Sequence, residues 1–396
     1  MKGSNRRNKI TAIAFLIVIG VITIGTFNNI RHRKDLNISK DNLKKTIADV
    51  DNILNENVYK KMEFIEFNGV VQRSMDKKVI DDVEKWRTVV KDKNDYLHFN
   101  LSSEPIDISK QANSVVKLRD FTKENGIDFM YVQSPFKVTG EAMQLPTGIE
   151  DYSNVIADNM LKELNKNNIN TLDLRDEMKE DNIDYKDAFF KTDHHWKPKT
   201  GFWATGEIIS KLNDDYGMNL DENGVNRDLK NYNEISYDQS FVGSQGKRVG
   251  KYYTEKDDFN MYVPKFDTNL TLTKHDNNSG VMKTKKGNFE DALIEKSLLK
   301  EGDIYENKYA AYLGGDNEFR IVNNQVENDE KVLIIKDSFV LPVASYLSLS
   351  AKETRVLDLR YYQGKEYDYI KKYDPDIVIM MYYPGTLSNM KTFEFK

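Results

Sequence analysis

The sequence predicts an α/β fold in which a parallel sheet is flanked by helices. From Ile106 to the C-terminus, apolar runs of strand length alternate with stretches of helical period. Three of the runs near the C-terminus have the composition of buried strands. Helical stretches separate these runs, and strands that alternate with helices are typical of parallel strands joined by crossover helices.

The elements follow one another in a regular order. We expect a helix over 109–125, which Gly126 ends, and then the strand IDFMYVQSP. A second helix is expected over 151–168, followed by the strand INTLDL. Pro198 stands where the first turn of a helix accepts proline, so a third helix is expected from there. The last three strands lie in KVLIIKDS, TRVLDLRYY and DIVIMMYY, separated by the helical stretches FVLPVASYLSLSA and KEYDYIKKYD.

Residues 231–324 interrupt this alternation. They are rich in Asn, Asp, Gly, Lys and Tyr and contain short alternating runs such as FNMYVPKF and NLTLTKH. We therefore expect an insertion, rich in strands or loops, that lies over the edge of the sheet. The domain that contains it is expected to span 106–396.

The N-terminus predicts a membrane anchor within residues 1–30. The charge-free run from Ile10 to Phe27 is at the short end for a membrane-spanning helix and longer than most signal-peptide cores. No small-residue cleavage site follows it, so we expect an uncleaved anchor. The flanking basic residues are Lys2, Arg6, Arg7 and Lys9 before the run and Arg31, Arg33 and Lys34 after it. This slight bias favours a cytoplasmic N-terminus and an external body.

Residues 31–105 are expected to form a juxtamembrane helical spacer. Apolar residues recur at intervals of three and four from Leu36 to about Ile65, which is typical of an amphipathic helix. A turn-rich stretch, VVKDKNDYLHFNLSSEP, follows it.

The composition excludes several classes of protein. A formal net charge of −5 provides no basic field for binding nucleic acid. The chain has no cysteine, so disulfides, thiolate zinc sites and cysteine nucleophiles are excluded.

The stretch TDHHW places two of the five histidines of the chain between a carboxylate and an indole. Ser338 follows the apolar run KVLIIK at a turn before a predicted helix, where α/β sheets bind ligands. A serine nucleophile needs a base, and a carboxylate two residues before a histidine can orient the imidazole. Backbone N–H groups at the start of the helix would stabilise an oxyanion. Ser338 is thus a candidate nucleophile, with His195 as its candidate base and Asp193 as the candidate orienting acid.

Other interpretations of these residues stay open. An isolated serine at a strand end is most often a helix cap. Adjacent histidines are candidate metal ligands, but no clear third ligand lies nearby, so no metal or other cofactor is expected. Asp193 and His194 are also candidates for capping the helix near Pro198. We expect His194 to point away from His195, and we exclude Asp337 from the triad because it adjoins the serine.

The TDHHW stretch resembles the hallmark of the DHHW family, which is similar to the AlgX/AlgJ-like alginate O-acetyltransferases of the SGNH hydrolase superfamily. Further matching segments, FVGSQGKRVG, AAYLGGDNEF, LIIKDSFVLPV and VLDLRYY, occur in the same order. The resemblance covers most of the chain from Ile106 to Pro384 and implies an SGNH-like, flavodoxin-like sheet. In AlgX/AlgJ-like proteins an Asp-x-His motif precedes the serine, and this pattern maps onto Asp193, His195 and Ser338.

The resemblance also implies a function. It implies transfer of acetyl groups onto an extracellular polysaccharide through an acetyl-serine, as in the synthesis of a biofilm exopolysaccharide. The implied partners are a membrane-bound O-acyltransferase, the polysaccharide synthase machinery and the polysaccharide acceptor. We therefore expect a single-pass protein of the cell membrane whose catalytic domain is extracellular. A polysaccharide acetyl-esterase with the same triad and a non-catalytic scaffold for polysaccharide synthesis are the alternatives.

Residues of the glycine-rich stretch GSQGKR are candidates for binding substrate. Gly243 and Ser244 are expected to approach it, with Arg248 as an ion-pair partner or an oxyanion-side donor. A plain glycine-rich turn is the alternative.

Three more residues are candidates for substrate binding. Arg360 and Tyr361 follow a predicted strand at the carboxyl edge of the sheet, where binding groups collect. An ion pair of Arg360 with Asp358 or Asp337 is the structural alternative. Trp196 is a candidate for stacking on a sugar, although core packing is the commoner role of tryptophan.

Overall fold

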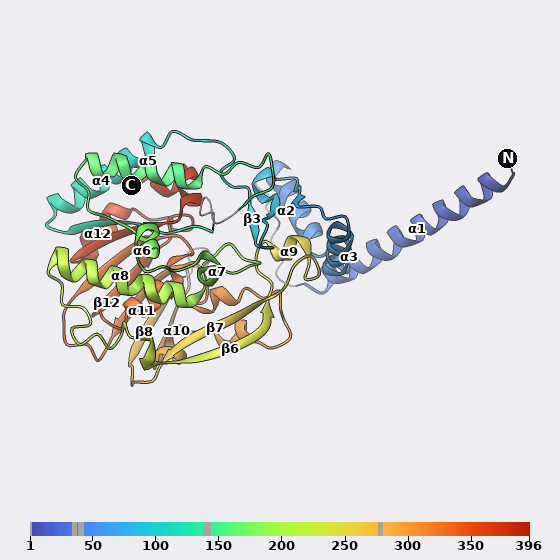
Figure 1. Ribbon diagram of the computed structural model, residues 1–396. Coiled ribbons are helices and arrows are strands. Elements are labelled where there is room, and N and C mark those ends of the chain that lie inside the picture. Colours follow the sequence, from blue (N-terminus) through green and yellow to red (C-terminus); the bar gives the residue numbers. More distant parts are fainter. Residues whose placement is uncertain (1, 34–37, 39–42, 138–143, 276–279) are drawn as a thin grey trace.

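The computed structural model describes residues 2–33, 38, 43–137, 144–275 and 280–396. Lys34, one of the basic residues after the apolar run, lies outside them. A three-layer α/β body contains most of the chain, and helix α1 (Lys2–Arg31) projects from it (Figure 1).

An eight-stranded sheet forms the centre of the body, in the order β5-β4-β13-β11-β12-β10-β8-β9. The first five strands are parallel: β5 (Thr171–Asp173), β4 (Asp128–Gln133), β13 (Ile377–Tyr382), β11 (Lys331–Lys336) and β12 (Glu353–Leu357). The other three are antiparallel to their neighbours: β10 (Glu318–Asn323), β8 (Leu270–His275) and β9 (Met282–Gly287). The predicted α/β class is confirmed. Four of the parallel strands lie within runs predicted as strands, and β12 begins one residue before its predicted run.

Helices cover both faces of the parallel strands (Figure 1). One face is covered by α4 (Ser109–Glu124), α5 (Ser153–Lys166) and α12 (Glu366–Tyr373), and the other by α8 (Pro198–Tyr216) and α11 (Val340–Leu347). Successive residues of β11 alternate between two hydrophobic cores. Leu333 packs in the core under α5, whereas Ile334 packs in the core under α11. A strand buried on both faces needs this continuous apolar run, since its side chains point alternately up and down.

The insertion over 231–324 extends the sheet instead of lying over its edge as expected. Its strands β8 and β10 continue the sheet beyond β12, and β9 forms the new edge. Among the described residues, two further strands, β6 (Tyr232–Phe241) and β7 (Asp257–Pro264), pair only with each other. The alternating sequence correctly indicated strands, but it carried no information about their partners. Short helices complete the body: α6 (Leu174–Glu180), α7 (Tyr185–Ala188), α9 (Gly246–Val249) and α10 (Phe289–Leu293).

The predicted helical spacer over 31–105 is helical only in part. It contains α2 (Leu43–Glu56) and α3 (Lys61–Ser74), and the amphipathic helix expected across them is broken at Lys60, whose φ is 56°. The turn-rich stretch after it instead supplies part of an antiparallel sheet of β1 (Val79–Ile80), β2 (Val89–Lys91) and β3 (Leu97–Phe99). Leu97 packs against Tyr253, so this sheet is part of the body.

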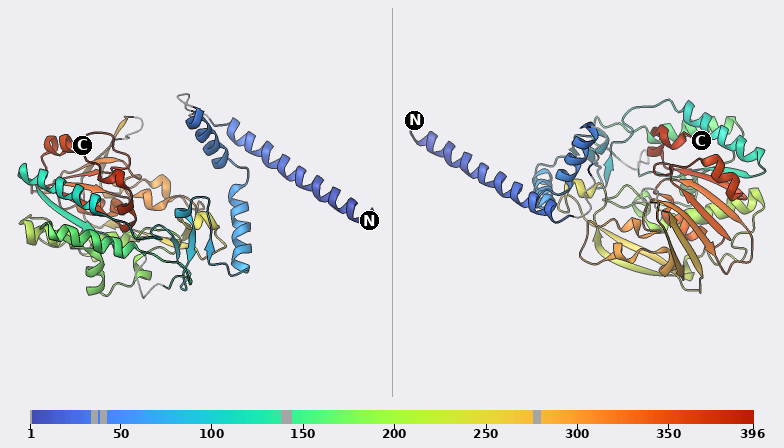
Figure 2. Two further views of the ribbon diagram at one scale, coloured as in Figure 1. Left: turned by 90° about the horizontal axis from the view of Figure 1, so that it is seen from above. Right: turned by 180° about the vertical axis from the view of Figure 1, so that it is seen from behind.

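Helix α1 leaves the body as a single rod in both views of Figure 2. Its segment Arg7–Arg31 is long and apolar enough to cross a membrane, or to serve as a signal sequence, and is not buried against the body. The α2–α3 junction contacts its C-terminal end, where the Tyr59 N–H donates to the Thr26 hydroxyl at 3.0 Å.

Candidate active site

The carboxyl ends of the parallel strands carry the predicted nucleophile. Ser338 follows β11 at the turn into α11, and 8% of its surface is exposed. The neighbouring Asp337 accepts hydrogen bonds from the N–H groups of Phe339 (3.0 Å) and Tyr383 (2.8 Å) and from the hydroxyl of Thr386 (2.8 Å). These bonds fix the turn, and they direct the Asp337 carboxylate away from the imidazole of His195.

The structure brings Asp193, His195 and Ser338 into one chain of hydrogen bonds, although 143 residues separate the histidine from the serine. His195 Nε2 lies 2.7 Å from Ser338 Oγ, and His195 Nδ1 lies 2.6 Å from Asp193 Oδ1. Burial alone would raise the pKa of Asp193, but the charges and hydrogen bonds of His195 and its neighbours hold that pKa well below its usual range. An ionised carboxylate, an imidazole and a hydroxyl in this order can activate the serine.

A buried carboxylate holds the loop that carries this motif. Asp257, at the start of β7, accepts hydrogen bonds from the N–H groups of Lys191 (2.6 Å) and Thr192 (2.7 Å) and from the Thr192 hydroxyl (2.6 Å). The Thr192 Oγ1 atom in turn accepts the N–H of Gly243 at 2.9 Å. Because Asp257 belongs to the insertion, the insertion positions the triad acid. Sequence reasoning missed this residue, since nothing in the run KDDFNMYVP indicates its partner.

The stretch around Gly243 supports Asp193 directly. A Cβ atom on Gly243 would lie 2.2 Å from the Cβ of Asp193, so only glycine fits at this position. The Ser244 N–H donates to Asp193 Oδ2 at 2.6 Å. Contact of either residue with substrate stays a prediction.

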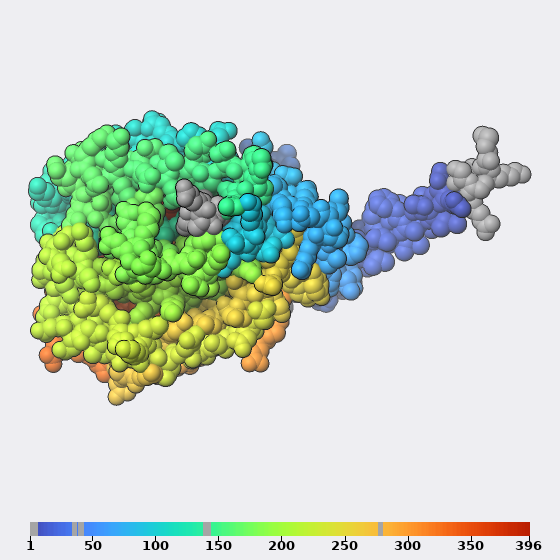
Figure 3. Space-filling view, viewed as in Figure 1, coloured from blue at the N-terminus to red at the C-terminus, as the bar shows by residue number. Residues whose placement is uncertain are grey.

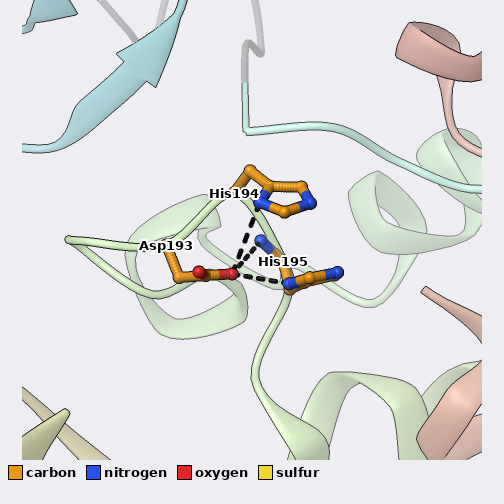
Figure 4. Close-up of side chains that lie close together, drawn as sticks. All are labelled: Asp193, His194 and His195. Atoms are coloured by element: carbon orange, nitrogen blue, oxygen red, sulfur yellow. Dashed lines mark hydrogen bonds and ion pairs between the residues drawn. The ribbon is translucent and has the colours of Figure 1, made fainter. Parts of the chain in front are cut away.

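The expectation that His194 points away from His195 is wrong. The two rings lie on the same side of Asp193 (Figure 4), with their centroids 3.8 Å apart. His194 Nδ1 lies 2.8 Å from the hydroxyl oxygen of Ser244. Residues 191–195 form a bend, and successive side chains alternate only along an extended strand.

The same three side chains are the cluster best placed to hold a metal among the described residues. The candidate ligand atoms of Asp193, His194 and His195 lie within 4.8 Å of one another. However, a separation of 2.6 Å between Asp193 Oδ1 and His195 Nδ1 is a hydrogen-bond distance. Both ring nitrogens of His195 are engaged, one by the carboxylate and one by the serine. The arrangement fits a proton relay better than a metal centre.

Trp196 is fully buried, so its assignment as a sugar-stacking residue is wrong. Its indole N–H donates to the hydroxyl of Tyr309 at 2.9 Å and to the carbonyl of Phe339 at 3.0 Å. Trp196 thus connects the bend at residues 191–195, the histidine loop, to the turn after Ser338. Tyr309 also stacks on the ring of His195, and no motif in the sequence distinguished it.

The predicted arginines form internal ion pairs. Arg248 pairs with Asp82 at 2.7 Å, which agrees with the ion-pair alternative and not with an oxyanion donor. Arg360 pairs with Asp358 at 2.5 Å and Asp316 at 3.0 Å, and not with Asp337. Lys336 joins the same buried cluster through both carboxylates.

Tyr361 lies largely on the surface beside Arg360. Its ring is 5.4 Å from the guanidinium carbon, and 43% of the residue is exposed. No contact joins Tyr361 to the triad among the described residues, so a role in binding substrate stays a prediction.

A cavity of about 510 Å³ lies beside the carboxyl ends of β4 and β5, with Phe136, Arg175 and Tyr185 in its lining. The ring of Phe136 packs at 5.3 Å on that of Tyr383, which lies 6.3 Å from the ring of His194. In Figure 3 this face is hollowed among the green segments, and C-terminal atoms coloured red are visible at the bottom. The rings of Phe136 and Tyr383 thus lie between the cavity and His194, and no triad residue lines the cavity.

Comparison with known proteins identifies the domain. Residues 95–225, which include the histidine motif, match the family described as SGNH hydrolase-like domain, acetyltransferase AlgX. The chain carries an SGNH hydrolase-like domain. The predicted resemblance to AlgX-like SGNH proteins is confirmed by this match, which names a family of acetyltransferases. No curated protein matches the sequence.

Solved structures share the fold of this SGNH hydrolase-like domain. PatB1 from Bacillus cereus with a sulfonyl adduct is 22% identical with a TM-score of 0.63, covering 78% of this chain and 97% of PatB1. A second PatB1 structure is 24% identical with a TM-score of 0.62, covering 78% and 99%. A DHHW family protein from Eubacterium siraeum is 17% identical with a TM-score of 0.55, covering 79% and 97%. At these identities the likeness establishes the fold alone.

Proposed function

We propose that this protein is an O-acetyltransferase that acetylates a hydroxyl of a cell-surface polysaccharide through an acetyl-serine at Ser338. The observation that carries the proposal is the hydrogen-bond chain from Asp193 through His195 to Ser338. It lies in a domain whose matching family is one of acetyltransferases.

The geometry supports a two-step transfer. Ser338 Oγ attacks the acetyl carbonyl carbon while His195 Nε2 takes the serine proton, and Asp193 stabilises the resulting imidazolium. The backbone N–H of Ser338 finds no acceptor among the described residues, so it is available to the oxyanion. His195 then gives its proton to the leaving group, and the acetyl group remains on Ser338.

An acceptor hydroxyl completes the reaction. Its oxygen attacks the acetyl carbonyl, His195 takes its proton, and the bond to Ser338 Oγ breaks. The serine oxygen receives the proton back from His195, which restores the starting state. No group besides the donor and the acceptor is consumed.

The apolar helix α1 supports a location at the cell membrane, with residues 106–396 outside the cell. An external enzyme has no access to cytosolic acetyl donors. A membrane-bound O-acyltransferase is therefore the partner that supplies acetyl groups, and the synthase machinery of an exopolysaccharide, such as that of a biofilm, supplies the acceptor.

Labelling of the nucleophile tests the proposal. The full-length protein is incubated at neutral pH with 4-nitrophenyl acetate or with an aryl sulfonyl fluoride, since one PatB1 structure contains a sulfonyl adduct. Intact mass should rise by one acetyl or one sulfonyl group, and peptide mapping should place it on Ser338.

Variants make the labelling test specific. Ser338→Ala and His195→Ala should each lower ester turnover by about 10³-fold or more. His275→Gln, which changes a histidine on β8 that pairs with Glu318, should retain activity. The proposal fails if neither reagent labels Ser338 in the folded protein. If chelators abolish turnover, the histidines are metal ligands instead.

An acetyl-esterase is the second candidate, because it uses the same three residues with water as acceptor. The 8% exposure of Ser338 shows that the site is not sealed from solvent. The ratio of acetylated alcohol to free acetate, formed from the same acetyl-enzyme, distinguishes the two functions.

A further inference from the structure

His194 is the member of the histidine motif that reaches solvent. Its side chain is 20% exposed, whereas those of Asp193 and His195 are 3% and 6% exposed. Aromatic rings surround it, with the centroids of Phe99, Phe339 and Tyr383 between 6.2 and 6.3 Å away. His194 is therefore the part of the motif that a ligand from solvent meets first.

The orientation of the ring is fixed. In Figure 4 the Nδ1 atoms of both histidines face Asp193, and their other nitrogens point to the opposite side. His195 Nε2 contacts Ser338 there, so His194 Nε2 faces the same space. No described residue accepts or donates a hydrogen bond at His194 Nε2, since the hydrogen bond of this ring is made through Nδ1.

Ser244 is placed to set the tautomer of His194. The Ser244 hydroxyl oxygen lies 2.8 Å from His194 Nδ1 and has no other acceptor among the described residues. Asp193 Oδ1 is 3.6 Å from the same nitrogen, which is beyond hydrogen-bond reach. When the hydroxyl donates to Nδ1, the hydrogen of the neutral imidazole lies on Nε2. This is the tautomer in which His194 can donate a hydrogen bond to a ligand. Burial and the neighbouring His195 lower the pKa of His194 to about 3, which keeps the ring neutral.

We propose that His194 binds the acceptor: its Nε2–H group donates a hydrogen bond to the oxygen of the hydroxyl that attacks the acetyl-serine. This inference rests on the proposed function and concerns its second step. While His194 holds the oxygen, the hydroxyl proton points to His195 Nε2, which removes it. The new C–O bond forms at the acceptor oxygen, the bond to Ser338 Oγ breaks, and the serine takes the proton from His195. His194 gives up no proton.

The inference assigns different tasks to the adjacent histidines. His195 moves a proton in both steps, so its loss abolishes both. His194 acts on the acceptor, so its loss leaves the acylation of Ser338 by an activated ester intact. A role of His194 in supporting only the fold would affect both steps alike.

Separate measurement of the two half-reactions tests this assignment. Full-length protein and variants are acylated with 4-nitrophenyl acetate, and the release of nitrophenol in the first turnover gives the acylation rate. The acetyl-enzyme then reacts in 2 M aqueous glycerol, where water and glycerol compete as acceptors. Mass spectrometry gives the ratio of acetyl-glycerol to acetate. The variants are His194→Phe, which keeps a ring without the donor, and His194→Gln, which keeps an N–H group at a similar reach.

The expected result is a loss confined to the second step. His194→Phe should acylate within about twofold of the native rate, and its ratio of acetyl-glycerol to acetate should fall about tenfold, the effect of one lost hydrogen bond. His194→Gln should recover a part of that ratio. Ser244→Ala, which frees the tautomer, should show an intermediate loss, and the control His275→Gln should match the native protein.

Three outcomes would overturn the inference. One is an unchanged product ratio in His194→Phe, and another is an equal loss of acylation in the same variant. The third is a native protein that forms the acetyl-enzyme but yields acetate alone in glycerol. In each of these cases the acetyl-serine itself is still observed on the native protein. Failure to acylate native Ser338 at all would instead contradict the proposed function.

Discussion

The phenol ring of Tyr309 stacks on the imidazole of His195, with the ring centroids 3.9 Å apart and the ring planes inclined by only 10°. The Tyr309 hydroxyl also accepts the indole N–H of Trp196 and donates to the carbonyl of Phe339. One buried side chain therefore holds both the base and the turn that follows the nucleophile. Burial raises the pKa of the Tyr309 hydroxyl well above its usual value, so this hydroxyl is harder to ionise.

Substitution of Tyr309 should separate stacking from hydrogen bonding. Tyr309→Phe keeps the ring, so ester turnover should stay within a few-fold of native, while the free energy of unfolding falls by about 1 kcal/mol. Tyr309→Leu frees the imidazole, so turnover should fall by about tenfold or more beyond any loss of stability. Turnover with the aryl acetate and urea unfolding check both values. Full activity in the folded Tyr309→Leu protein would show that the stacking is irrelevant to catalysis.

Two glycines give a matched pair for testing the support of Asp193. An alanine Cβ at Gly243 would overlap the Asp193 side chain, whereas Gly206 in α8 has nothing within 4 Å of such a Cβ. Gly243→Ala should displace the carboxylate and lower turnover by about 10²-fold or more, because a displaced carboxylate no longer orients the base. Gly206→Ala should leave turnover unchanged and stabilise the helix by roughly 0.5–1 kcal/mol. Equal activity in the two folded variants would refute the positional role of Gly243.

Lys137 should make stability depend on pH. Its ammonium group is fully buried and donates to the carbonyl of Leu97 (2.8 Å) and the side-chain oxygen of Gln245 (3.1 Å). Burial lowers its pKa from 10.5 to about 7. Between these values the unfolded chain binds more protons than the folded one, so the contribution of this group to stability rises with pH.

Comparison with Lys137→Met isolates this effect from other titrating groups. From pH 7.5 to 9.5, the unfolding free energy of the native protein should rise relative to that of the variant by up to about 1.4 kcal/mol per pH unit. Urea unfolding at fixed ionic strength measures the difference. A difference that stays constant with pH would mean that the folded protein keeps Lys137 charged throughout this range.

The absence of cysteine allows a clean test of topology. Val83 is fully exposed on the body, so Val83→Cys should react with a membrane-impermeant maleimide in intact cells. Ser4→Cys precedes the apolar run and should react only after the membrane is permeabilised. The native chain, which has no thiol, is the control. Labelling of Ser4→Cys alone in intact cells would place the body inside the cell.

The fold was predictable where one segment decides its own structure. The run KVLIIK has four consecutive apolar residues between two lysines, as a strand covered on both faces requires, and β11 lies there. The insertion was less predictable, because the alternation in β8 indicates a strand without indicating that β10 is its neighbour. Pairing partners depend on distant segments, and a single sequence does not encode them locally.

The residues of the candidate site also divide into those that the sequence predicts and those that it does not. Asp193, His195 and Ser338 were predictable because each bears a suitable chemical group in a suitable local context, and because the resemblance to the DHHW family selected them among the alternatives. Asp257 and Tyr309 were not, since their roles exist only after the insertion folds against the histidine loop. The prediction that His194 points away from His195 was wrong, because the bend at 191–195 turns both side chains to the same side.

The edges of the central sheet have a consequence for association between folded molecules. One edge, β5, has only three residues. The other, β9, is exposed along nearly its whole length and carries Lys283, Lys285 and Lys286. A short edge and a row of like charges both disfavour pairing with a strand of another molecule. The insertion thus ends the sheet on one side in a charged strand that disfavours such pairing, in addition to holding the histidine loop.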